Sequence, residues 1–166
     1  LVQEFTGSHY TAIQMLESAV GKDHVKIDNG GLPWQRWEAL RDHKHRAVVV
    51  MEPFISLGLK EGAHIIAAEF YRGGEVIGTN LSAEQRKAYY DAENEAVDLI
   101  NGDVYKYAHH ICAPTKGALK PNELLRAFVH FKHVDYYDPA LFAQTYDWMK
   151  SRGFTEGQSQ HGALVL

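Results

Sequence analysis

Several features that would point to a particular class of protein are scarce in this sequence. One cysteine, Cys112, in 166 residues excludes an internal disulfide. No apolar run approaches the length that a helix needs to span a bilayer. The 17 Lys and Arg residues are scattered and outnumbered by 21 Asp and Glu, so charge gives no case for nucleic-acid binding. The chain of 166 residues is long enough for one domain, and 45% of its residues are hydrophobic, which is enough for a core.

Common catalytic and metal-binding motifs are also missing. The sequence has no GxGxxG, no GxxxxGK[ST] and no GxSxG. Ten histidines include two close pairs, His43 with His45 and His109 with His110, but neither matches HExxH or a Cys/His cluster. We therefore expect no metal site and no cofactor. Cys112 follows the second pair, where it is either an activated thiol or, more commonly, a small buried hydrophobic residue.

The start of the chain gives no targeting signal. It begins at Leu1 and enters a strand-like run without a charged segment or an apolar leader. We expect a processed product or an excerpt of a longer chain. The sequence does not indicate localisation: a transport protein would be periplasmic or on the cell surface, and an enzyme cytoplasmic.

The stretch from Arg46 to Tyr71 organises the predicted fold. Its first part, residues 47–51, is a continuous apolar run typical of a strand buried on both faces. Glu52-Pro53 ends the run, and residues 54–60 read as a short helix. Residues 65–70 are a second apolar run of strand length. A strand, a crossover and another strand predict an α/β fold with a parallel sheet.

The remaining elements follow from apolar spacing and capping residues. In the first half we also predict strands over residues 1–5 and 24–28 and helices over 8–20 and 33–42. Trp34 and Trp37 of the helix over 33–42 are expected to pack on the sheet. After Gly73-Gly74 the pattern becomes almost entirely helical. The predicted helices cover 82–101, 104–112, 121–129 and 138–153, and the tail from 155 is expected to be loose. These helices have apolar faces but no sheet of their own.

Two groups of residues are candidate ligand contacts. Gly7, Ser8 and His9 follow the first strand and open a helix, where backbone N–H groups can bind an anion. The alternative is that Ser8 is an ordinary N-cap on a core helix.

The second group lies just past the carboxyl ends of two predicted strands, where ligands of parallel sheets bind. It consists of Glu52 after the first strand and of Tyr71 and Arg72 after the second. The alternative is that Glu52 only caps its helix and that Arg72 is solvated.

Dispersed segments resemble a known family. They are FTGSHY at 5–10, EALRD at 38–42, AVVVMEPFISL at 47–57, residues 92–100 with EAVDLI at their end, and TYDWM at 145–149. Together they resemble the second half of periplasmic substrate-binding proteins that serve nitrate, sulfonate, taurine and thiamine-precursor transporters. The likeness spans roughly residues 1–154 and includes no single diagnostic motif. It departs from the family at residues 43–46, where HKHR replaces an acidic turn.

The resemblance implies a domain organisation of the periplasmic-binding-protein type II kind. Residues 1–73 would be the α/β lobe that closes on the ligand. Residues 74–154 would be the helical cover of a first lobe that this chain does not contain, and 155–166 a loose tail. The missing lobe would explain why the helices after Gly74 lack a sheet.

The resemblance also implies a function. The chain would be a solute-binding protein, or its second half, that binds a small anionic or polar organic molecule for ABC-type uptake. Gly7, Ser8 and His9 resemble the segment that contacts the anionic head, Glu52 the acid that faces the cleft, and Tyr71 with Arg72 the hinge crossing. The implied partners are an ABC permease and a second copy or another chain that supplies the missing lobe. The alternatives are an enzyme on the same scaffold, such as a decarboxylase, desulfinase or thiamine-pyrimidine synthase, and a subunit that needs a partner chain.

Overall fold

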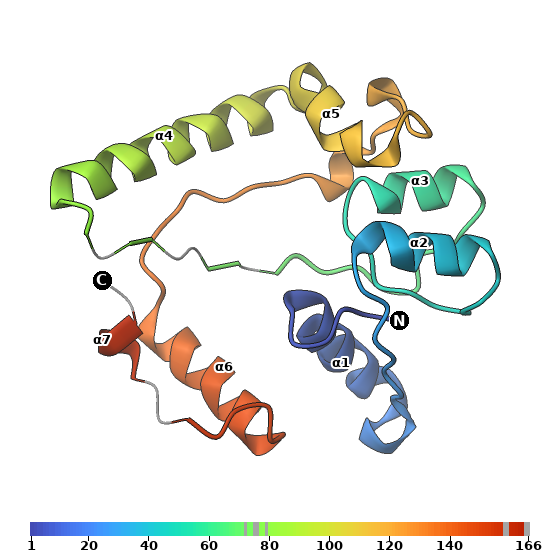
Figure 1. Ribbon diagram of the computed structural model, residues 1–166, viewed down its shortest axis with the longest axis horizontal. Coiled ribbons are helices and arrows are strands. Elements are labelled where there is room, and N and C mark those ends of the chain that lie inside the picture. Colours follow the sequence, from blue (N-terminus) through green and yellow to red (C-terminus); the bar gives the residue numbers. More distant parts are fainter. Residues whose placement is uncertain (72, 75–76, 79, 158–159, 165–166) are drawn as a thin grey trace. The chain divides into compact units, whose positions relative to one another are not determined.

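The computed structural model describes residues 1–71, 73–74, 77–78, 80–157 and 160–164. Within them the fold is all-α (Figure 1), with about 55% of residues in helices. The α-helices are α1 (Gly7–Val20), α2 (Pro33–Arg41), α3 (Phe54–Lys60), α4 (Ala83–Gly102), α5 (Val104–Cys112), α6 (Pro139–Ser151) and α7 (His161–Leu164). Four short 3-10 turns join them: η1 (Lys22–His24), η2 (Ala113–Thr115), η3 (Pro121–Glu123) and η4 (Arg126–Phe128).

The predicted α/β fold class is wrong. Among the described residues there is no sheet, and the pairing is limited to one isolated parallel bridge between Val2 and Asn29. Around it Val2 N–H donates to the Asp28 carbonyl oxygen at 3.0 Å, and Val49 N–H donates to the Leu1 carbonyl oxygen at 2.8 Å. Three of the predicted strands therefore meet at Leu1 and Val2. The ladder stops there because the chain turns at Phe5, whose φ is 58°, and enters α1.

The fourth predicted strand, residues 65–70, has no regular secondary structure and is exposed. Its Ile66 side chain is 77% exposed, and no backbone hydrogen bond of the segment occurs within the described chain. A β-strand is stable only when its N–H and C=O groups are paired by a neighbouring strand. An apolar run therefore predicts a strand correctly only where such a neighbour exists.

The local helix signals predicted the helices well. The predicted helices over 54–60, 82–101, 104–112 and 138–153 are confirmed within a few residues at each end as α3, α4, α5 and α6. Asp138 caps α6, since its Oδ1 accepts a hydrogen bond from Leu141 N–H at 2.8 Å, and Pro139 occupies the first helical position. The helix predicted over 121–129 is wrong, because η3 and η4 replace it with two separate turns.

The chain divides into two compact units. The first contains residues 1–73 and 95–132, and the second contains residues 74–94 and 133–166, to the extent that these are described. In the second unit, Asn94 Oδ1 accepts a hydrogen bond from Val134 N–H at 2.7 Å, and the Phe142 and Tyr146 rings stack with centroids 5.7 Å apart. Each unit is considered by itself below.

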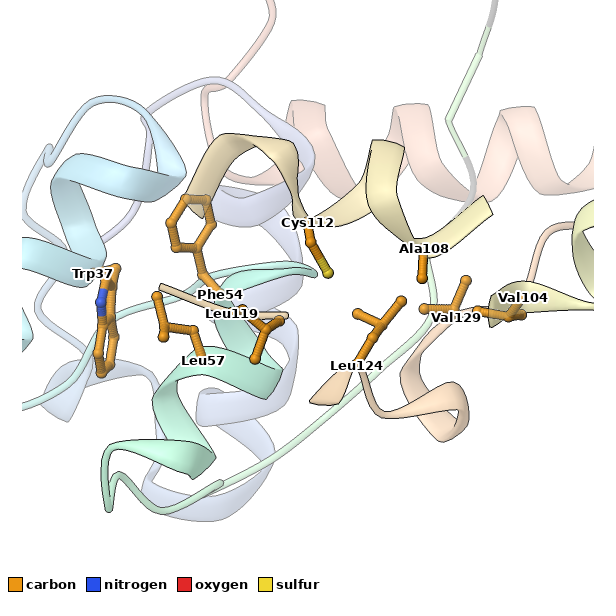
Figure 2. Close-up of a cluster of buried hydrophobic side chains, with 9 residues drawn as sticks. All are labelled: Trp37, Phe54, Leu57, Val104, Ala108, Cys112, Leu119, Leu124 and Val129. Carbon is orange, nitrogen blue, oxygen red and sulfur yellow. The ribbon is translucent and has the colours of Figure 1, made fainter. Parts of the chain in front are cut away.

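The first unit has a continuous hydrophobic core (Figure 2). Helix α5 supplies Val104, Ala108 and Cys112, which are four residues apart and so share one face. The other contributors come from α2, α3 and the segment after α5, and the complete cluster is Trp37, Phe54, Leu57, Val104, Ala108, Cys112, Leu119, Leu124 and Val129. This core fixes α2 and α3 against the chain that follows α5.

Candidate functional site

The structure brings together two of the residues predicted to contact a ligand. A Cβ atom placed on Gly7 would lie 2.8 Å from Tyr71 Cε2, so the Tyr71 ring packs directly against the start of α1. Gly7 and Tyr71 are distant in sequence and belong to the two different groups of candidate contacts, whose role in ligand binding stays a prediction. Arg72 lies outside the described residues.

Ser8 and His9 have local roles at the same helix end. Ser8 Oγ accepts a hydrogen bond from Gln3 N–H at 3.2 Å, and His9 Nδ1 accepts one from Phe5 N–H at 3.2 Å. Both side chains are buried, and the N-cap residue of α1 is Thr6 rather than Ser8. These contacts shape the turn before α1, so anion binding by the backbone of residues 7–9 remains a prediction.

Glu52 bonds to its own helix. Its two carboxylate oxygens accept hydrogen bonds from Ser56 N–H at 3.1 Å and from the Ser56 hydroxyl at 2.7 Å. Ser56 Oγ in turn accepts a hydrogen bond from Leu125 N–H at 2.9 Å, which ties α3 to the segment between η3 and η4. This arrangement matches the alternative in which Glu52 serves the first turn of its helix.

The surroundings of Glu52 and Cys112 favour their neutral forms. Burial raises the pKa of Glu52, and the hydrogen bonds from Ser56 oppose only part of that rise. Burial also raises the pKa of the Cys112 thiol, and the charges of Glu52 and Glu123 raise it further. A thiol held in this way is a poor nucleophile, because the thiolate is the reactive form.

Glu52→Gln should therefore change how stability depends on pH. A carboxyl whose pKa is raised by folding stabilises the folded state below its ordinary pKa of 4.5, and that contribution is lost as pH rises through the raised value. Relative to the natural chain, the variant should be more stable at pH 7, and the difference should shrink as pH falls through the raised pKa towards 4.5.

Urea unfolding of both chains between pH 4 and pH 7 measures this difference. Glu69→Gln, which removes the same charge from an exposed position, is the control. A variant that is less stable than the natural chain at pH 7 and equal to it at acid pH would contradict the prediction. It would mean that the hydrogen bonds from Ser56 outweigh burial.

A surface cavity in the first unit is the candidate site that we consider first. Its volume is about 370 Å³, and α2, α3 and residues 114–118 enclose it. The residues that line it are Trp34, Trp37, Glu38, Arg41, Phe54, Leu57, Glu61, Pro114, Thr115, Lys116 and Ala118. We call it the α2–α3 cavity. None of the six predicted ligand contacts is among these residues.

Helical periodicity explains two walls of the α2–α3 cavity. On α2 the lining residues occupy positions 34, 37, 38 and 41, which fall on one helical face, and on α3 they occupy 54 and 57. Trp37 is 5% exposed and belongs to the core, whereas Trp34 is 42% exposed. The cavity therefore has a fixed apolar base and one accessible indole.

The third wall is held in place by polar contacts. Lys60 Nζ, at the end of α3, donates to the Ala118 carbonyl oxygen and lies 2.8 Å from Glu123 Oε2. The same Glu123 oxygen accepts a hydrogen bond from Lys120 N–H at 2.8 Å. Hydrogen bonds from Lys60 and the Lys120 backbone hold the pKa of Glu123 below its usual value. This network fixes the chain from Ala118 to Glu123 against α3.

The rim of the cavity carries charges of both signs. Lys116 Nζ lies 6.0 Å from the centroid of the Trp34 ring, within reach of a cation–π contact. Arg41 pairs with Asp42 at 3.0 Å. Glu38 and Glu61 also line the cavity, and neither forms an ion pair with another described residue.

The second unit has a smaller hollow of about 290 Å³. Ala83, Arg86, Lys87, Tyr90 and Tyr136 line it. Lys87 pairs with Asp91 at 2.6 Å, and Arg86 donates to the Leu81 carbonyl oxygen at 3.2 Å. Because local partners already engage both cations and no buried apolar base is present, the α2–α3 cavity is the stronger candidate.

Within the described part of the chain, no group of three or more His, Cys, Asp or Glu side chains is placed to hold a metal ion. None of the described helices combines the length and apolarity that crossing a membrane requires. No protein family, curated protein or solved structure matches this chain.

The cavity was not predicted from the sequence, because Trp34 and Trp37 were both expected to pack in the core, and only Trp37 does so. The spacing of Trp34, Glu38 and Arg41 on α2 was a usable signal, because exposed tryptophan beside charged residues is typical of binding surfaces. Lys116 gave no signal, since it reaches the cavity through tertiary contacts.

Proposed function

We propose that this chain binds a small organic molecule with a polar or charged group in the α2–α3 cavity. The observation that supports this most directly is a hollow of about 370 Å³ with an aromatic base and a charged rim. Ligand sites are typically concave, roughly 300–1,000 Å³ in volume, and mainly apolar with a few polar groups. The cavity has this composition, with Trp37, Phe54 and Leu57 at its base.

The proposed ligand class agrees with the one that the sequence resemblance implies, a small anionic or polar organic molecule. Delivery of that ligand to an ABC permease is the second part of the proposal and rests on the resemblance alone. The enzymatic alternative gains nothing from Cys112, whose raised pKa disfavours the thiolate.

Trp34→Ala should weaken binding of any ligand that occupies the cavity. Loss of one stacking indole should raise Kd by roughly 3- to 10-fold. A panel of small aryl carboxylates, sulfonates and amines is screened against the 166-residue chain by ligand-observed NMR, and Kd is then measured for each binder.

Trp148→Ala is the matched control, because Trp148 is the third tryptophan of the sequence and lies in the second unit. It should leave Kd unchanged. If no member of the panel binds, or if every binder is insensitive to Trp34→Ala, the proposal fails. Circular dichroism of both variants verifies that they remain folded.

A further inference from the structure

We infer that the ligand of the α2–α3 cavity is a planar zwitterion, an aryl group with one anionic and one cationic substituent. This inference rests on the proposed function and adds the charge pattern of the ligand. Three observations support it: the accessible indole of Trp34, a cation held over that indole, and two carboxylates in the same lining.

Lys116 would bind the anionic substituent. Its ammonium lies over the Trp34 ring at 6.0 Å, so a planar ligand that stacks on Trp34 enters the space beside this charge. Arg41 is less suited to the role, since Asp42 already occupies its guanidinium at 3.0 Å. The backbone of Lys116 has φ of 53°, and Thr115 Oγ1 stabilises the turn by donating to the Cys112 carbonyl oxygen at 2.7 Å. The backbone position from which this side chain extends is therefore defined by the fold.

Glu38 and Glu61 would bind the cationic substituent. They come from different helices, Glu38 from α2 and Glu61 from the residue after α3. Neither has an ion-pair partner within the part of the chain that the structure describes. A purely anionic ligand would be repelled by these carboxylates, and a purely cationic one by Lys116. A ligand with both charges avoids both penalties.

Three probes of nearly equal shape test this charge pattern. They are 4-(aminomethyl)benzoate, which carries both charges, 4-methylbenzoate, which carries only the anion, and 4-methylbenzylamine, which carries only the cation. Kd is measured by NMR titration of the 166-residue chain. We expect the zwitterion to bind about 3- to 10-fold more tightly than either singly charged probe, as one charge-assisted contact at a partly exposed site implies.

Two variants assign the charges to residues. Lys116→Met keeps an unbranched side chain, one atom shorter, without the charge. It should weaken binding of the zwitterion and of 4-methylbenzoate by a similar factor, and leave binding of 4-methylbenzylamine unchanged or tighter. Glu61→Gln should weaken binding of the zwitterion and of 4-methylbenzylamine, and leave binding of 4-methylbenzoate unchanged or tighter. Both side chains are exposed, so neither variant should disturb the fold, and thermal melting checks this.

The outcomes separate the two proposals. The inference is overturned if a singly charged probe binds as tightly as the zwitterion, or if Lys116→Met changes the Kd of all three probes equally. In either case, a Kd that still depends on Trp34 leaves the proposed function standing. If none of these probes binds and the wider panel also yields no ligand that depends on Trp34, the proposed function fails and the inference fails with it.

Discussion

Leu124→Ala should lower the free energy of unfolding by about 2–5 kcal/mol, the usual effect of truncating a buried leucine. Leu124 is 1% exposed and lies in the core between α5 and α3 (Figure 2). Its neighbour provides a matched control. Leu125 is 41% exposed, and its backbone N–H to Ser56 Oγ is unaffected by side-chain truncation, so Leu125→Ala should change stability by less than about 1 kcal/mol.

Urea unfolding at constant pH, followed by far-UV circular dichroism, measures both variants. The denaturant slopes of the two chains must agree for the comparison to report on the folded state. Equal losses at positions 124 and 125 would show that the segment after η3 does not pack as the structure describes. A larger loss at Leu125 would reverse the assignment of which side chain faces the core.

The helices were predictable because their signals are local. Apolar residues four apart in α5 and the Asp138-Pro139 start of α6 need no information from distant chain segments. The lack of a sheet among the described residues was not predictable in this way, because a strand depends on a partner. Residues 47–51 and 65–70 have similar apolar character, yet among the described residues only the first region, through Val49, forms a backbone hydrogen bond to a distant segment, at Leu1.

The residues of the candidate site were also predictable only where local sequence determines their contacts. Gly7 and Tyr71 were candidates from two separate groups, and the structure places the Tyr71 ring against Gly7, which leaves their binding role a prediction. Glu52 was predicted to contact a ligand, but its carboxylate accepts hydrogen bonds from Ser56, four residues away. The position of Lys116 depends on the contact between Lys60 and Glu123, which lie far apart in sequence. A single sequence without that tertiary contact does not show that Lys116 faces α2.

Arg36 was not singled out by its pattern, and it supports the last prediction. Its side chain is 1% exposed, although arginine is rarely buried without a partner. Nε donates to the Val49 carbonyl oxygen at 2.6 Å, and Nη1 donates to the Gly31 carbonyl oxygen. Among the described residues no carboxylate forms an ion pair with it. Burial lowers the pKa of this guanidinium, and the nearby Tyr71 opposes the shift.

Arg36→Ala should destabilise the chain by about 2–4 kcal/mol, because it leaves a cavity and deprives two carbonyl groups of their donors. Arg36→Lys should recover only part of the lost stability, since a single ammonium cannot donate to both carbonyl oxygens as the planar guanidinium does. Arg46→Ala, at an exposed position, is the control and should stay within about 0.5 kcal/mol of the natural chain.

Arg36→Met decides between two explanations of why this arginine is buried. If it is as stable as the natural chain, desolvation of the charge offsets what the carbonyl bonds contribute. If it is as unstable as Arg36→Ala, the bonds to Gly31 and Val49 are what fix α2 beside these two segments.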